Sequence, residues 1–176
     1  LGLQHALTSS VMSSEVTRST TRAVPLAADD VAGISLLYPK AGLAGEVAAI
    51  SGRVTMTGQG MHLASVVALE VAGSAVSALT DPDGYYKITG LPPGQYYLYV
   101  HPLPPEVQPG LGPADIVLPL DSEGKPVPSG PVFETAFYPD VKSVLQTTPL
   151  VVAAGQTIEG YDFAVRPRGA LDVHSV

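Results

Sequence analysis

The chain of 176 residues contains no cysteine, few charged side chains and no long apolar run. Without cysteine it can form no disulfide, no thiolate nucleophile and no metal site built on sulfur. No hydrophobic stretch approaches the roughly 18 residues of a membrane-spanning helix, so no membrane span is expected. Charged residues make up 14% of the chain and the net charge is −7. A basic surface for nucleic acid is therefore not expected either.

Glycine and proline are abundant instead, with 18 and 17 residues. Such a composition places turns at short intervals and disfavours long helices. Hydrophobic residues make up 45% of the chain, which indicates a folded globular protein. The length fits one ordinary domain or two small ones. Because the chain opens with Leu1, without an initiator methionine or a signal sequence, we expect that it has lost its N-terminus.

Residues 25–39, with the sequence PLAADDVAGISLLYP, predict one short helix. Pro25 suits the first turn of a helix, and Asp29 and Asp30 lie where the helix dipole favours carboxylates. Apolar residues then recur at helical spacing: Val31, Ile34 and Leu37. Residues 40–46, KAGLAGE, are predicted to be a linker of small residues.

From residue 47 onward the pattern is that of short β-strands. Five segments rich in Val, Ile, Thr and Tyr predict strands: ISGRVTM, LASVVALEV, GSAVSALT, YYKITG and QYYLYVHP. Two more strands are predicted near residues 149–153 and 158–166, and Asp81-Pro82-Asp83-Gly84 predicts a hairpin turn. The chain is therefore predicted to be mainly β, with an antiparallel β-sandwich over 47–167 and a tail over 168–176.

The first residues contain a histidine in a pattern typical of zinc peptidases. Gly2-Leu3-Gln4-His5 matches the G-x-x-H that ends the motif H-E-x-x-H-x-x-G-x-x-H, and Met12 follows seven residues later. A G-x-x-H match alone is too short to be specific. The alternatives are that His5 is an exposed loop histidine, Met12 a core side chain, and Asp29 and Asp30 plain helix-start charges.

The order of these elements resembles the end of the catalytic domain of the matrixin family of metzincin zinc endopeptidases. In that family the third histidine and the Met-turn precede a closing helix of the form D-D-x-x-G-I-x-x-L-Y. This chain has those residues at Asp29, Asp30, Gly33, Ile34, Leu37 and Tyr38. The resemblance covers residues 1–39 and predicts the truncated C-terminal lobe of an α+β domain before the sandwich.

That resemblance implies roles for five residues. His5 would be the third zinc ligand, Gly2 the residue that turns the backbone toward it, and Met12 an apolar floor beneath the metal. Asp29 and Asp30 would start the closing helix and tie it to neighbouring loops. The other two histidines and the glutamate base would precede Leu1, so no catalytic residue is assigned and the chain itself is expected to be inactive. The resemblance also implies secretion and protein or peptide substrates.

Motifs of the predicted sandwich resemble the carboxypeptidase regulatory-like domain, a transthyretin-like (prealbumin-like) β-sandwich. They are Gly52-Arg53-Val54, then T-D-x-D-G-x-Y over 80–86 and G-L-P-P-G-x-Y over 90–96. Such domains are accessory, so the resemblance implies packing or binding and not carboxypeptidase chemistry. Two ligands are considered beside the plain turn and core interpretations: a calcium ion at the D-x-D-G turn, and a glycan or peptide on an outward ledge of tyrosines. The tyrosines concerned are Tyr85, Tyr86, Tyr96, Tyr97 and Tyr99.

Two functions therefore follow from the sequence. The first is the C-terminal fragment of a secreted zinc-dependent metalloendopeptidase with an accessory sandwich. The alternative is a non-catalytic β-sandwich module for protein or carbohydrate binding or adhesion.

Overall fold

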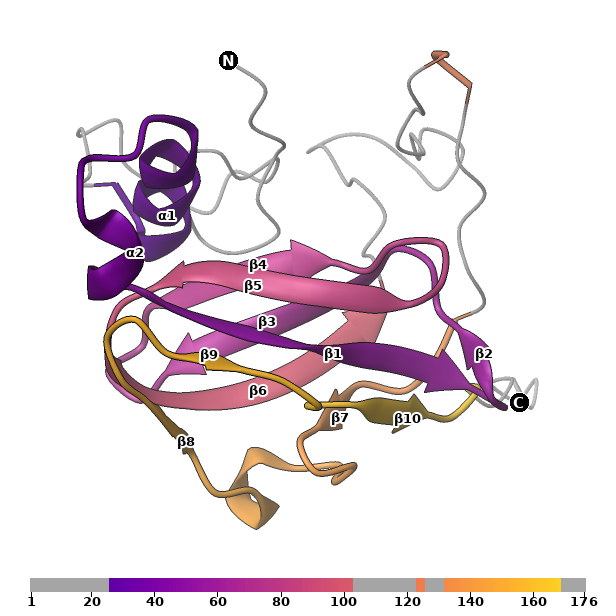
Figure 1. Cartoon of the computed structure of the whole chain (residues 1–176). Helices are drawn as coiled ribbons and strands as arrows, with labels where there is room; N and C mark the ends of the chain where they lie inside the picture. Colours follow the sequence, from indigo (N-terminus) through magenta and orange to yellow (C-terminus); the bar gives the residue numbers. More distant parts are fainter. Residues whose placement is uncertain (1–25, 103–122, 126–131, 169–176) are drawn as a thin grey trace, which may run out of the picture.

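Two β-sheets packed face to face form the body of the molecule, as Figure 1 shows in the computed structural model. The structure describes residues 26–102, 123–125 and 132–168. The prediction of a mainly β chain with a β-sandwich is confirmed. Neither of the α-helices in the described ranges has the length and apolarity of a membrane span.

The first sheet is built around a long central strand, β1 (Ala48–Met56). This strand pairs antiparallel with two others and parallel with two more. The antiparallel partners are β2 (Gln59–Gly60) and β5 (Tyr85–Leu91), and the parallel partners are β9 (Thr157–Ile158) and β10 (Phe163–Val165).

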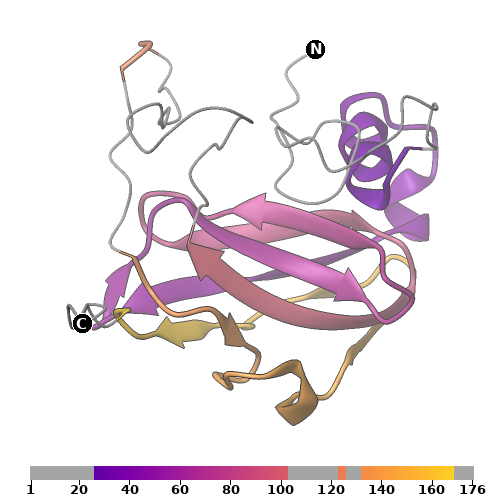
Figure 2. The ribbon, with the colours of Figure 1, turned by 180° about the vertical axis from the view of Figure 1, so that it is seen from behind.

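The second sheet lies behind the first in Figure 1 and is seen from its outer side in Figure 2. Its strands run in the order β4-β3-β6-β7, and β8 also pairs with β6. Their bounds are β3 (Ala64–Glu70), β4 (Ala75–Leu79), β6 (Gly94–Pro102), β7 (Ala136–Phe137) and β8 (Leu150–Val152). A 3-10 turn, η2 (Val144–Gln146), precedes β8.

The core lies between the sheets and follows from alternation along the strands, because every second side chain of a strand points inward. Ile50 and Val54 of β1, and Ile88 of β5, have no exposed surface. Leu98 and Val100 of β6 are equally buried on the facing sheet. The period of two in the sequence therefore corresponds to one buried face on each sheet.

The C-terminal strands differ from the prediction. Residues 158–166 were expected to form one antiparallel strand, but β9 and β10 are separate and both run parallel to β1. Between them Gly160 has a φ of 81°, and the next residue, Tyr161, donates its N–H to the Ser51 carbonyl. A Cβ at Gly52 would overlap the carbonyl group of Tyr161. Glycine is therefore required at this position, because the returning chain crosses directly over β1.

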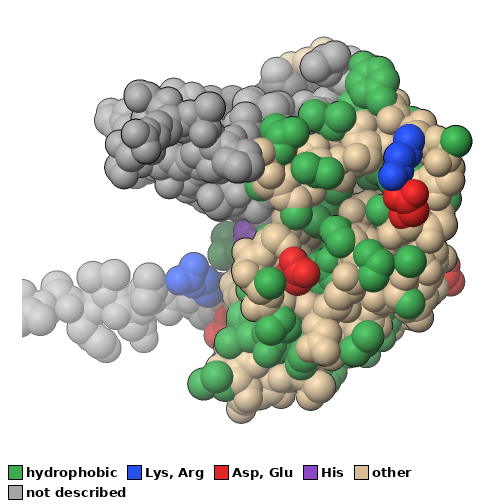
Figure 3. Space-filling view, turned by 90° about the vertical axis from the view of Figure 1, so that its left-hand side faces the viewer, with side chains coloured by type: hydrophobic (Ala, Val, Ile, Leu, Met, Phe, Trp, Pro, Cys, Tyr) green, Lys and Arg blue, Asp and Glu red, His purple; other side chains and the backbone are tan. Residues whose placement is uncertain are grey.

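Helix α1 (Ala28–Leu37) forms within the range that the sequence predicts and packs against β5 and β4. Its small residues make this contact: Ala32 is 4% exposed, and a Cβ at Gly90 would lie 2.9 Å from the Ala32 Cβ. The larger residues with helical spacing face away from the sandwich, since Val31, Ile34 and Leu37 are 48%, 41% and 43% exposed. Figure 3 shows this end of the molecule, with hydrophobic side chains on its surface and few charged ones.

A second helix, α2 (Leu43–Glu46), occupies the segment that the sequence predicts as a linker. It is one turn long, and Lys40 forms a salt bridge of 2.6 Å with Glu46 across it. Within the described residues both helices adjoin the sandwich, and no separate lobe precedes it. The rest of the predicted metzincin lobe, residues 1–25, lies outside the described ranges.

Replacing either Val54 or Leu91 by Ala should lower the free energy of unfolding by about 2–4 kcal/mol, because both side chains are fully buried and each truncation leaves a cavity. Urea denaturation followed by circular dichroism measures this. Val151→Ala is the matched control, since Val151 is 70% exposed; its effect should stay within about 0.5 kcal/mol. Equal midpoints for all three variants would contradict the observed core.

Candidate functional site

The residues predicted to form a zinc site are only partly described. Gly2, His5 and Met12 lie outside the described ranges, and Asp29 and Asp30 lie in the first turn of α1. In the described part of the chain no group of three or more His, Asp or Glu side chains could hold a metal ion. The described residues thus do not provide the donor set of a zinc cage.

Asp29 and Asp30 hold α1 in place. The Asp30 carboxylate accepts the N–H of Ala27 at 2.9 Å, at the start of the helix. The Asp29 carboxylate accepts the N–H of Ser77 at 2.9 Å. Ser77 lies in β4, so Asp29 ties the helix to a strand of the sandwich. The carboxylates thus act at the helix N-terminus, where the dipole favours them, and also across the interface.

The D-x-D-G segment forms a tight turn through its first carboxylate. Asp81 Oδ1 accepts the N–H groups of Asp83 at 3.0 Å and of Tyr85 at 2.8 Å, and Gly84 follows with a φ of 85°. These bonds support the interpretation of the motif as a turn, and the described residues offer no group of three or more carboxylate or histidine ligands for a metal ion. However, this is not a hairpin turn, because β4 belongs to the second sheet and β5 to the first.

The tyrosines divide between core and surface. Tyr86 and Tyr96 are 4% and 1% exposed, whereas Tyr97 and Tyr99 are half-buried on the outer side of β6. The predicted alternation along β6 is therefore confirmed. Only Tyr85 of the five is largely exposed, at 55%.

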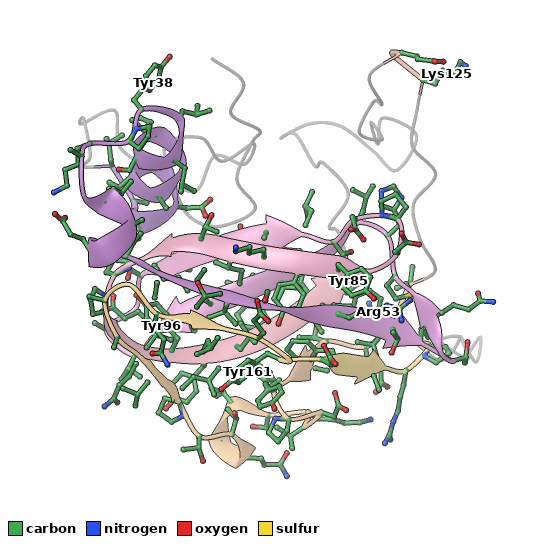
Figure 4. The ribbon with its side chains drawn as sticks, viewed as in Figure 1. Tyr38, Arg53, Tyr85, Tyr96, Lys125 and Tyr161 are labelled. Carbon is green, nitrogen blue, oxygen red and sulfur yellow. The ribbon has the colours of Figure 1, made fainter. Side chains whose placement is uncertain are left out.

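One ring face of Tyr85 is already occupied. The guanidinium carbon of Arg53 lies 5.0 Å from the ring centroid, within the range of a cation–π contact. Arg53 is held there because its Nε donates to the Asp83 carbonyl at 2.9 Å. Figure 4 shows the two labelled side chains next to each other. An outward tyrosine ledge for stacking a sugar is thus reduced to one ring with a single open face.

The buried tyrosines have structural hydroxyl groups. Tyr86 donates to the Tyr161 carbonyl at 2.6 Å, and Tyr96 donates to the Pro92 carbonyl at 2.8 Å. Burial raises the pKa of both phenols, for Tyr96 to about 12 and for Tyr86 further, and nearby carboxylates add to the effect. The G-L-P-P-G-x-Y motif is therefore a packing motif, in which the last Tyr ties down the turn before it.

A cavity of about 500 Å³ opens to solvent beside the turn between β4 and β5. It lies where the two strands diverge into different sheets. Its walls are Leu63, Leu79, Thr80, Asp81, Tyr85, Tyr86 and Lys87. Sequence reasoning missed this site because the turn was expected to join paired strands. Lys87, a charged residue on the exposed face of a strand, was the available signal.

Tyr96→Phe tests the assignment of the buried hydroxyl. At neutral pH the variant should be less stable by about 0.5–1.5 kcal/mol, since it leaves the Pro92 carbonyl without its donor. The unfolded phenol ionises near 10.0 and the folded one near 12. Between these values the unfolded state binds fewer protons, so wild-type stability falls as pH rises.

The difference in the free energy of unfolding between the wild type and Tyr96→Phe should therefore become smaller above pH 10. Urea midpoints measured at neutral pH and at several pH values from 10 upward follow it. A gap that stays constant over that range would show that Tyr96 is not protected in the fold.

Comparison with known families gives one match, to the carboxypeptidase regulatory-like domain over residues 49–112. The match begins in β1, so it does not include residues 1–39, whose resemblance to the matrixin family stays a prediction. Comparison with curated proteins gives no match.

Solved structures with some similarity include three bacterial proteins. A DUF3823 family protein from Parabacteroides merdae has 16% identity and a TM-score of 0.34 over 70% of this chain and 47% of its own. Fervidolysin from Fervidobacterium pennivorans, a keratinolytic enzyme related to subtilisin, has 18% identity and a TM-score of 0.34 over 66% of this chain and 16% of its own. The pilus 2b backbone protein of group B streptococcus has 14% identity and a TM-score of 0.31 over 72% of this chain and 42% of its own.

The chain thus spans less than half the length of each of these structures. The family match covers the strands from β1 to β6, which form most of both sheets. Together the match and the two observed sheets support a carboxypeptidase regulatory-like β-sandwich domain in this chain.

Proposed function

We propose that this chain is a non-catalytic β-sandwich module that binds a protein partner. The observation that carries the proposal is the open cavity at the side of the sandwich, between strands of different sheets. It is lined by apolar, hydroxyl and charged side chains, as binding sites commonly are. The family match, to a regulatory-like domain, agrees with an accessory role.

The polar groups around the cavity have structural partners. The Thr80 hydroxyl donates to the Met61 carbonyl and accepts the Ala64 N–H, and the Asp81 carboxylate accepts two N–H groups. The Tyr86 hydroxyl donates to a backbone carbonyl. A nucleophile needs an adjacent base that is free to take its proton. The described cavity walls offer no such pair.

A protein ligand fits this surface better than a carbohydrate. Arg53 covers one face of Tyr85, the exposed tyrosine at the cavity. The described walls therefore offer a sugar one open ring face and no second exposed aromatic ring. The cavity instead combines apolar side chains with the edges of two strands, and edge strands readily pair with another polypeptide.

The proposal is tested by applying the labelled chain to two arrays, one of folded protein domains and one of glycans. We expect saturable binding to members of the protein array and none to the glycans. The same preparation, supplied with zinc, should not cleave fluorescent casein, and an active thermolysin sample is the positive control. Casein cleavage that 1,10-phenanthroline abolishes, or binding to glycans alone, would overturn this function.

A second candidate is that the chain is the C-terminal part of a secreted zinc metalloendopeptidase. The order of Gly2, His5, Met12 and the Asp29-Asp30 helix start supports it. One structural observation favours it as well: α1 contacts the sandwich through small residues while larger apolar ones remain exposed. A helix with two apolar faces is expected where it is shared between two packed units.

For this candidate, the sequence encoded before Leu1 should contain H-E-x-x-H with its last histidine three residues before Gly2. The chain itself should bind zinc weakly, and His5→Ala should leave its thermal unfolding unchanged, since a single imidazole makes no cage. Titration calorimetry with zinc measures the affinity of the wild type and of His5→Ala, and a thermal melt of each measures its stability. A different upstream sequence would remove the peptidase candidate and leave the binding module.

A further inference from the structure

We propose that the cavity between β4 and β5 binds an extended peptide segment of a partner protein, which adds to the open edge of β5 as a further strand. This assignment rests on the proposed function and gives it a site and a ligand class. It follows from the direction of backbone groups on both strands, from the cavity walls and from the charge of Lys87.

The hydrogen-bonding pattern of β5 shows which of its backbone groups point away from β1. Tyr85 exchanges bonds with Asp81, since the Asp81 N–H donates to the Tyr85 carbonyl at 2.9 Å and the Tyr85 N–H donates to Asp81 Oδ1 at 2.8 Å. Gly84 lies on the other side, with its carbonyl accepting the Val54 N–H of β1 at 2.8 Å. The direction of the backbone N–H and carbonyl groups alternates along a strand. Those of Lys87 therefore point to the open edge, as those of Tyr85 do.

Among the described residues, nothing pairs with the β5 edge just beyond the turn. In the described ranges β5 has β1 as its only partner strand. No other described residue bonds to the N–H or the carbonyl of Lys87. These are the groups that a peptide strand would engage, with main-chain bonds providing affinity.

The edge of β4 faces the same space. Thr80 pairs with the β3 side, because its N–H donates to the Ala64 carbonyl at 3.0 Å and its carbonyl accepts the Leu63 N–H at 3.1 Å. The backbone N–H and carbonyl of the preceding residue, Leu79, thus point away from β3. Its side chain and that of Leu63 line the cavity. A peptide in this position has an apolar wall on one side and an open strand edge on the other.

Helix α1 covers the end of β4 and β5 that lies farther from the turn. Its contact with β4 shows how an outward backbone N–H can be satisfied. Two residues before Leu79, the outward N–H of Ser77 is bonded by the Asp29 carboxylate. The helix also contacts β5 close to Gly90. Among the described elements, none covers the stretch between α1 and the turn. Its length fits a short segment of a few residues rather than a long strand.

The side chains at the cavity indicate the composition of the peptide. Lys87 is exposed, lines the cavity and forms no salt bridge with another described residue. The other charged wall residue, Asp81, has its Oδ1 directed to two N–H groups of the turn, so the cation is the charge left for a ligand to pair with. An acidic side chain on the peptide complements Lys87, while the next side chain, on the opposite face of the added strand, contacts Leu63 and Leu79. The ligand class is an extended segment in which apolar and acidic residues alternate.

The test uses the full chain and a phage library of random short peptides, and the enriched peptide is then synthesised as the probe. We expect enrichment of alternating apolar and acidic sequences. Without peptide, the Lys87 amide should exchange with solvent faster than those of Tyr86 and Ile88, which face β1. Binding of the probe should slow the Lys87 exchange, measured by NMR.

Two variants at one position separate backbone pairing from charge. Lys87→Pro removes the edge N–H without removing a bond to β1, and should weaken binding by about tenfold or more. Lys87→Gln keeps the N–H and should weaken binding less. Thermal unfolding checks that both fold. A probe with N-methyl groups on alternate residues tests the same bonds in the wild-type chain and should lose binding.

The assignment is overturned if no peptide is enriched, if Lys87→Pro or N-methylation leaves binding unchanged, or if the probe leaves Lys87 exchange unaltered. Self-association of the chain through this edge, seen as a dimer that the probe does not dissociate, also overturns it. If the protein array shows a partner whose binding is the same for both Lys87 variants, the proposed function stands and this site falls.

Discussion

The crossing of the chain from β4 to β5 is the constraint that shapes the side of the sandwich where the cavity lies. Within a few residues the chain leaves one sheet and enters the other, and buried bonds fix the path. Thr80, which is 2% exposed, ties the start of the turn to Met61 and Ala64. A Cβ at Gly60 would overlap the Asp83 carbonyl, so the turn rests directly on the backbone of β2. Because these contacts hold the two strands apart in different sheets, their edges diverge and the cavity opens between them.

The same geometry explains why the edge is covered in part. An open strand edge favours pairing with other chains, and proteins commonly cover it with a helix or with charged residues. Here α1 covers one end through Ala32, Gly90 and the Asp29 carboxylate. At the other end the Asp81 carboxylate satisfies the N–H of Tyr85. An aspartate thus accepts an outward N–H on each strand, Asp29 on β4 and Asp81 on β5. Lys87 lies on β5 between the turn and the part of the strand that α1 contacts.

Much of this fold could be predicted from the sequence because it is local. Alternation of apolar residues predicted β1, β3, β4, β5 and β6, although not the short strand β2. It also separated Tyr96 from its half-buried neighbours Tyr97 and Tyr99. Sheet membership was not predictable in the same way, since strand pairing depends on residues far apart in the sequence. The parallel pairing of β9 and β10 with β1, which requires Gly52 to lie under Tyr161, leaves no local pattern that marks it.

The site was harder to predict than the fold for a related reason. The D-P-D-G turn is typical of a hairpin, and only the assignment of its two strands to different sheets turns its neighbourhood into a cavity. The face of α1 was likewise not predictable from size alone: Ala32 packs against Gly90 because two small residues allow close approach, and Ile34 is left outside.

The helix and the edge cannot be independent features. Asp29 bonds to β4 two residues from Leu79, which lines the cavity, so a displacement of α1 would expose the Ser77 N–H and lengthen the open edge. Val31 and Ile34, which are exposed, lie on the side of α1 away from this bond. Asp29 therefore links the position of the helix to the length of the β4 edge that is left open.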